Sequence, residues 1–116
     1  RVQIIKGWLD GDGATYEKIY DVALSDDRKP NQLVGSTVDL QTASYTNSIG
    51  ATHFNRVWID PDFDSSLSAF YYVRVLQIPT PRWTAYDEVK FKVSMPDEVP
   101  KIVQDRAYTS AIWYTP

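Results

Sequence analysis

The stretch at residues 69–83 constrains the fold more than any other part of the chain. It reads AFYYVRVLQIPTPRW, in which aromatic and β-branched residues fit a pleated strand, and Pro79 and Pro81 remove backbone donors that a longer strand would need. Side chains of an extended segment alternate between two faces, and both faces are apolar here. One face carries Phe70, Tyr72, Arg74, Leu76 and Ile78, and the other carries Ala69, Tyr71, Val73 and Val75. We therefore predict a central strand packed against a second layer or a neighbouring domain.

The start of the chain predicts an antiparallel hairpin. Residues 2–9 are rich in β-branched and aromatic residues, and the Asp-Gly-Asp-Gly sequence at 10–13 is typical of a tight turn. Residues 16–24 form the return strand, with apolar and charged side chains on opposite faces. A helix would also place Tyr16, Ile19, Tyr20 and Ala23 on one side, but the preceding turn favours the hairpin.

Other segments complete an all-β prediction. Residues 25–36 are a polar loop, and residues 37–45 form an edge strand or a short irregular crossing. Residues 52–59 predict a strand that makes a second antiparallel hairpin with the central strand, and residues 103–114 predict a last strand beside it. Between them, residues 83–101 form a long excursion with a short helical turn near 84–92, centred on residues 86–90. The expected fold is mainly β: one domain over residues 1–116, an antiparallel two-layer β-sandwich in the style of immunoglobulin and fibronectin domains.

Composition excludes several classes of function. A formal charge of −3 and a pI near 5.0 argue against a general nucleic-acid binder, which needs a basic surface. No apolar run approaches the roughly 18 residues of a membrane helix, so we expect no membrane insertion. The chain has no cysteine, so thiolate chemistry is absent. Because it begins at Arg1 inside a predicted strand, we expect a fragment of a longer protein.

One loop carries the densest group of carboxylates, which consists of Asp60, Asp62 and Asp64. Oxygen ligands offered from one loop suit calcium, so these residues are a candidate calcium site. An EF-hand loop starting at Asp60 would require glycine at Ser65 and glutamate at Tyr71, and that motif fails. The favoured interpretation is a connecting loop whose aspartates accept hydrogen bonds from backbone amides while Phe63 packs inward.

No catalytic set is apparent in the sequence. His53 is the only histidine, so a multi-histidine metal site is impossible within the chain, and no Gly-x-Ser-x-Gly motif accompanies its serines. We interpret His53 as a polar residue at the start of a strand, and we expect no catalytic residue, resident metal or cofactor.

Aromatic residues offer the other candidate surface. Four tryptophans, with eight tyrosines, could stack on sugars, although a β-sandwich core is their commoner use. Trp83 beside Arg82 and two prolines is the best candidate for exposure, and an exposed Pro-Arg-Trp loop would be a docking surface. We therefore name Trp83, Arg82 and Trp8 as the candidate interface or ligand surface.

Several segments together resemble a known family. They are VQIIKGW at 2–8, YTNSIG at 45–50, WIDPDFD at 58–64, FYYVRVL at 70–76, PTPRW at 79–83 and RAYTSAIWY at 106–114. They are similar to the C-terminal region of a bacterial family of uncharacterised proteins. The resemblance implies a preceding region similar to the PHP (polymerase and histidinol phosphatase) metal-dependent hydrolases. It carries no catalytic residue onto this chain, and Ala111 stands where such tails usually have proline.

These observations give two expectations of function. The first is a non-catalytic accessory domain of a PHP-like metal-dependent hydrolase, with the catalytic domain of the same protein as its partner. The alternative is a carbohydrate- or calcium-binding β-sandwich module that uses Trp83 and the loop from Asp60 to Asp64. Apolar surface exposed without the partner domain also predicts a concentration-dependent homodimer, with Trp8 or Trp83 near the contact.

Overall fold

A computed structural model describes residues 1–116 and shows a mainly β chain with a single helix. The chain divides into two compact units. The first contains Arg1–Leu24, Thr52–Val75 and Arg106–Pro116, and the second contains Ser25–Ala51 and Leu76–Asp105. The elements are β1 (Val2–Leu9), β2 (Thr15–Ala23), β3 (Ala69–Leu76), β4 (Thr80–Pro81), α1 (Trp83–Phe91), β5 (Ile102–Val103), β6 (Arg106–Tyr108) and β7 (Ile112–Tyr114).

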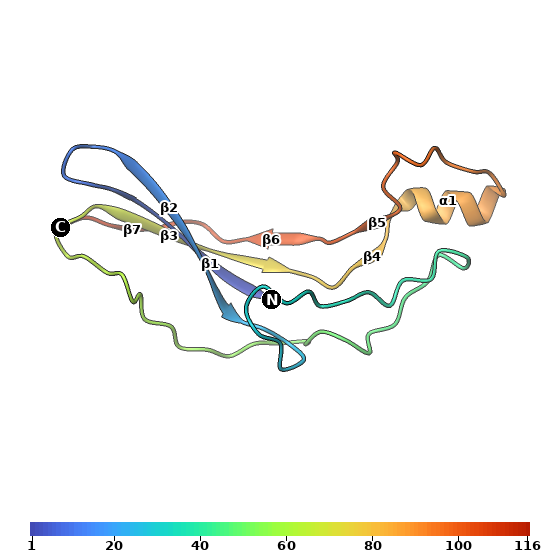
Figure 1. Ribbon diagram of the computed structural model, residues 1–116, viewed down its shortest axis with the longest axis horizontal. Coiled ribbons are helices and arrows are strands. Elements are labelled where there is room, and N and C mark those ends of the chain that lie inside the picture. The colour runs from blue at the N-terminus through green and yellow to red at the C-terminus, as the bar shows by residue number, and fades with distance from the viewer. The chain divides into compact units, whose positions relative to one another are not determined.

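The first unit is built on one five-stranded sheet. Its strands follow the order β2-β1-β3-β6, and β7 also pairs with β3 (Figure 1). β1 and β2 are antiparallel, and the turn between them closes with a hydrogen bond from the Asp10 amide to the Ala14 carbonyl at 3.0 Å. Gly13 adopts a φ of 82° in this turn, a left-handed conformation that favours glycine. The predicted hairpin and the central position of the β3 strand are confirmed.

The register assigns the side chains of this sheet to two faces. Opposed residues share a face, so Lys6, Lys18 and Tyr71 stand in one row on what we call the covered face. Gly7, opposed to both Glu17 and Phe70, lies on what we call the open face. The alternation predicted for residues 69–76 is confirmed by this register. Ile5 is 1% exposed and is the largest apolar side chain that the chain buries completely.

The second unit contains the helix and a two-stranded sheet. β4 pairs with β5, and the Arg82 amide continues this pairing with a bond to the Lys101 carbonyl at 2.9 Å. The helix α1 begins after Arg82, which is extended, and ends at Lys92, whose φ of 54° is left-handed. Thr84 is buried and donates to the Pro100 carbonyl at 2.7 Å, which fixes the first turn. The helical turn predicted near 84–92 is confirmed as a helix of nine residues.

Two strand predictions are wrong, since one predicted strand is absent and the other is divided into three short strands. Residues 52–59 form no strand and no second hairpin, because both edges of β3 are already paired, by β1 on one side and by β6 and β7 on the other. The strand predicted over 103–114 is divided into β5, β6 and β7, of which the last two pair with β3. Residues 37–45 contain only an isolated bridge between Asp39 and Ser44, so the irregular crossing is correct. The structure shows antiparallel sheets, and the two-layer immunoglobulin-like topology stays a prediction.

Candidate functional site

A buried ion pair lies on the covered face of the sheet. Lys6 extends from β1, and its Nζ donates to the Asp60 carboxylate at 2.6 Å and to the Asp62 carbonyl at 2.7 Å. The two charged side chains are only 6% and 7% exposed. Burying two charges is costly unless they are paired and their remaining hydrogen-bonding positions are satisfied. This pair therefore fixes residues 60–62 against the strand that carries Lys6.

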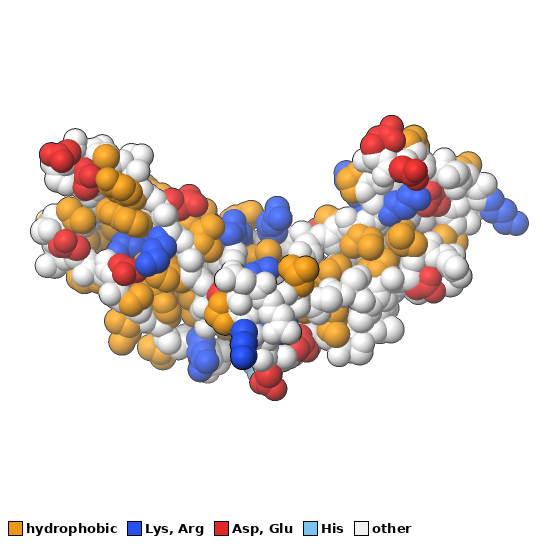
Figure 2. Space-filling model, in the orientation of Figure 1, with side chains coloured by type: hydrophobic (Ala, Val, Ile, Leu, Met, Phe, Trp, Pro, Cys, Tyr) orange, Lys and Arg blue, Asp and Glu red, His pale blue; other side chains and the backbone are white.

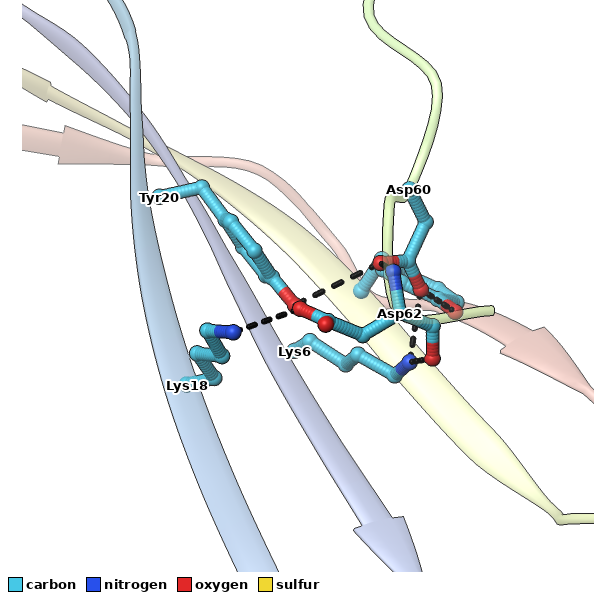
Figure 3. A network of polar contacts seen from close by, with 6 residues as sticks. Lys6, Lys18, Tyr20, Asp60 and Asp62 are labelled. Carbon is cyan, nitrogen blue, oxygen red and sulfur yellow. Dashed lines mark hydrogen bonds and ion pairs between the residues drawn. The ribbon is translucent and has the colours of Figure 1, made fainter. Parts of the chain in front are cut away.

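Two tyrosines and a second lysine complete this group. The Tyr71 hydroxyl donates to Asp60 at 2.8 Å, and the Tyr20 hydroxyl donates to Asp62 at 2.6 Å and to Asp60 at 3.3 Å. Lys18 forms an ion pair with Asp62 at 2.5 Å, in which both side chains are about half exposed. Figure 3 shows how side chains from β1 and β2 converge on the two aspartates of the loop. We call these six residues the clamp: Lys6, Lys18, Tyr20, Asp60, Asp62 and Tyr71.

The electrostatics of the clamp favour fixed protonation states. Burial raises the pKa of Asp60, but hydrogen bonds from Lys6, from the Asp62 amide and from Tyr71 outweigh it, and the pKa falls below its usual value. Burial and the hydrogen bond to Asp60 raise the pKa of Tyr71 to about 12. Burial and the bond to Asp62 also raise the pKa of Tyr20. The aspartates are thus ionised and the tyrosines neutral at pH 7, so the clamp suits positioning rather than proton transfer.

The ring of Trp58 packs against the two tyrosines of the clamp. The Trp58 ring contacts the rings of Tyr20 and Tyr71, with centroids 5.0 Å and 6.3 Å apart. Its neighbours in the sequence point the other way, since Val57 is 89% exposed and Ile59 is 83% exposed. The covering segment therefore holds Trp58 and Asp60 inward and presents two aliphatic side chains outward.

The aspartates of the candidate calcium loop accept hydrogen bonds from backbone amides, and two of them pair with lysines, so they are not arranged as cation ligands. Asp60 accepts a hydrogen bond from the Asp62 amide at 2.9 Å, and Asp64 accepts one from the Ser66 amide at 2.8 Å. These turns match the favoured interpretation of the loop. Lysine ammonium groups already neutralise Asp60 and Asp62, and no group of three histidine, cysteine or acidic side chains is placed to hold a metal ion. Phe63 packs edge-on against Tyr114 at 5.0 Å but stays 51% exposed, so its inward packing is only partial.

The remaining predicted residues are His53, Trp83, Arg82 and Trp8. His53 is exposed beside Thr52 in a segment without strand structure. Trp83 is 60% exposed at the first position of α1, as expected, and Arg82 immediately precedes the helix. Trp8 is half-buried in the first unit, where its ring stacks on Tyr16 at 5.4 Å. Trp8 belongs to the first unit and Trp83 belongs to the second.

Sequence reasoning missed a hollow of about 650 Å³ on the first unit. Its lining includes Gly7, Glu17, Phe70 and Trp113, which the register places in one row across the open face. These residues come from four different strands, and their spacing in the sequence carries no signal. The sequence analysis placed Trp113 only in the last predicted strand, over residues 103–114.

The comparisons with known proteins give one match. Residues 1–116 match the family described as Protein of unknown function (DUF3604). Neither the curated proteins nor the solved structures contain a significant match to the chain. The helix α1 lacks the length and the apolar character needed to span a membrane.

Proposed function

Since the chain belongs to the DUF3604 family, we propose that it is a non-catalytic accessory domain that packs against a metal-dependent hydrolase domain of the same protein. The resemblance of its sequence segments to the C-terminal region of a family with a PHP-like preceding domain supports the hydrolase part of this proposal. The substrate of that hydrolase is left open. The role of this chain is to cover the neighbouring domain or to shape access to its site.

The observation that carries the proposal is the distribution of apolar side chains. The buried apolar residues are Ile5 and four alanines, whereas 19 large hydrophobic residues are exposed. Val57 and Ile59, at 89% and 83%, are the most exposed of them. Figure 2 shows hydrophobic side chains in patches on the surface over the sheet. Exposed apolar patches of this kind usually mark an interaction surface.

The clamp explains how one such patch is presented. Lys6 and Asp60 hold the loop after Ile59, and Trp58 anchors the segment on the sheet through Tyr20 and Tyr71. An extended segment anchored on alternate residues must point the intervening residues outward. Val57 and Ile59 therefore form a fixed aliphatic row, which we propose as the contact with the neighbouring domain.

A hydrolase screen tests the accessory role. Phosphoester and ester substrates are offered, with added manganese, zinc or iron, to the 116-residue chain and to the longer protein that contains it. Activity is expected only in the longer protein. Metal-dependent turnover by the 116-residue chain would contradict the proposal, and the acidic loop with His53 would then be the first place to mutate.

A binding measurement tests the proposed contact. The neighbouring domain, produced separately, is titrated calorimetrically with the chain and with a Val57→Asp, Ile59→Asp variant. A charged pair at the centre of an apolar contact should weaken binding at least about tenfold. The matched control is Leu33→Asp, another apolar position that is 79% exposed, which should bind as the unaltered chain does. Equal binding by all three proteins would place the contact elsewhere.

Self-association is the expected behaviour of the chain without its neighbour. Apolar surface left uncovered favours a concentration-dependent dimer. Trp83, 60% exposed, is better placed near such a contact than the half-buried Trp8. Sedimentation over a wide concentration range measures this, and a monomer throughout would argue against an exposed docking surface.

The calcium-binding and carbohydrate-binding versions of the alternative function differ in the support that they receive. The lysines that pair with Asp60 and Asp62 leave the calcium version without support from the geometry. A calcium titration that perturbs the tryptophan fluorescence would revive it. The carbohydrate version gains an observation that the sequence did not offer, which is the hollow on the open face.

A further inference from the structure

We propose that the hollow on the open face binds an uncharged saccharide. This goes beyond the accessory role, because it assigns a ligand to a surface separate from the row of Val57 and Ile59. The hollow measures about 650 Å³, within the range of small-molecule sites in proteins. Its aromatic wall and its free polar groups both point to the same class of ligand.

The aromatic wall is formed by two neighbouring strands. Trp113 of β7 is opposed to Phe70 of β3, and their ring centroids lie 5.3 Å apart with the planes inclined by 47°. Trp113 is 74% exposed, so its ring is available to a ligand. The C–H faces of a sugar ring pack on exposed aromatic faces, and tryptophan offers the largest of them.

The floor of the hollow requires glycine. Gly7 of β1 is opposed to Phe70, and a Cβ built on Gly7 would collide with the phenylalanine ring. The missing side chain therefore lets the Phe70 ring lie across the strand. A larger residue at position 7 would displace the ring and rebuild the aromatic wall.

The opposite wall supplies hydrogen-bonding groups. Glu17 of β2 is opposed to Gly7, and Thr15 is opposed to Leu9, so both polar residues share the open face. Their side chains make no hydrogen bond or ion pair within the chain, and Glu17 is exposed. A carboxylate and a hydroxyl opposite an aromatic wall suit the hydroxyl-bearing edge of a sugar.

The charge of the residues that line the hollow indicates which sugars it should bind. Glu17 is the one charged side chain among the lining residues, and no lysine or arginine lines the hollow. The whole chain carries a formal charge of −3. An anionic sugar would meet an unpaired carboxylate without a counter-charge, so the hollow should reject uronic acids and accept neutral sugars.

The test follows the four tryptophan indole N–H signals by NMR during titration of the 116-residue chain. The neutral probes are maltose, cellobiose, xylobiose and N,N′-diacetylchitobiose, and the anionic probe is digalacturonate. At least one neutral disaccharide should shift the Trp113 signal saturably in the millimolar range, about −4 kcal/mol of binding free energy. Digalacturonate should leave it unmoved, and the Trp83 signal should be unaffected throughout.

Two variants locate the binding. Trp113→Ala should weaken the best disaccharide at least about tenfold, whereas Trp83→Ala, which removes an exposed tryptophan outside the hollow, should leave its affinity unchanged. Glu17→Gln keeps the shape and should bind the neutral sugar while losing the discrimination against digalacturonate. A dispersed spectrum before titration shows that each variant is folded. The proposal is overturned if no neutral probe moves the Trp113 signal, or if Trp113→Ala binds as tightly as the unaltered chain.

Discussion

The two faces of the five-stranded sheet differ in the side chains they carry and in what covers them. The covered face carries Lys6, Lys18 and two tyrosines, and it is closed by a loop that brings complementary carboxylates. The open face carries aromatic side chains, among them Phe70 and Tyr72, whose rings are parallel and 6.4 Å apart, and it contains the hollow lined by Trp113. The polar residues of the covered face thus bind a specific loop of the chain, whereas the aromatic residues of the open face keep surface that other molecules can contact. The difference predicts which substitutions cost stability and which cost only binding.

The largest effect is expected from Lys6→Met. The substitution leaves the Asp60 carboxylate, 7% exposed, without its counter-charge, and breaking a buried pair typically costs about 3–5 kcal/mol of unfolding free energy. Urea denaturation measures this. The matched control is Lys18→Met, whose half-exposed pair with Asp62 is screened by solvent and should contribute far less to stability. Adding Asp60→Leu to Lys6→Met should recover stability, and equal losses in the two lysine variants would remove the distinction between buried and exposed pairs.

The next effect concerns the open face. Gly7→Ala places a Cβ against the Phe70 ring, and overpacking of this kind costs about 1–3 kcal/mol. Gly11→Ala is the control, because no atom lies within 4 Å of a Cβ there. Thermal unfolding should separate the two variants. If Gly7→Ala is as stable as Gly11→Ala, the position of the Phe70 ring does not depend on the missing side chain at Gly7.

Acid should weaken the covered face. The folded pKa of Asp60 lies below its usual value of 3.8, so its contribution to stability is present above that value and is lost as the pH falls through the folded pKa. Urea denaturation between pH 6 and pH 2, roughly the range in which carboxylates titrate, should show stability falling at the acid end. Asp60→Asn should be less stable at neutral pH and should show a shallower fall. An unchanged slope would mean that other carboxylates control the acid limit.

The smallest effect is expected from Trp113→Ala. This ring is 74% exposed, so its removal should change the unfolding free energy by less than about 1 kcal/mol. Trp58→Ala is the comparison on the covered face, where removal of the ring that packs on Tyr20 and Tyr71 should cost about 3 kcal/mol. Denaturation curves of both variants test the contrast. A large loss in Trp113→Ala would make that tryptophan part of the core.

Local pattern was enough to predict the first hairpin, the faces of β3 and the helix. The turn at residues 10–13 and the alternation at residues 69–76 are properties of neighbouring residues, and the structure confirms both. Residues 52–59 are also rich in aromatic and β-branched residues. Whether such a segment pairs or crosses depends on which strands already occupy the edges of β3. That information is not local, so the strand prediction there is wrong.

The candidate sites show the same limit. The sequence showed Asp60, Asp62 and Asp64 as one group of carboxylates. The partners of the first two are Lys6 and Lys18, which lie more than 40 residues away in the chain. Only the register of β1 and β2 brings the two lysines into one row facing the loop. The hollow likewise depends on one row of residues from four strands, Glu17, Gly7, Phe70 and Trp113, which no spacing in the sequence indicates.

Hydrogen exchange tests the central claim, that the row of Val57 and Ile59 faces a neighbouring domain while the open face does not. Amide exchange is compared, peptide by peptide, between the 116-residue chain and a protein in which the proposed hydrolase domain is joined to this chain. The account predicts slower exchange over residues 56–63 in the joined protein and unchanged exchange over residues 110–116. Equal exchange over residues 56–63 in both proteins would contradict it.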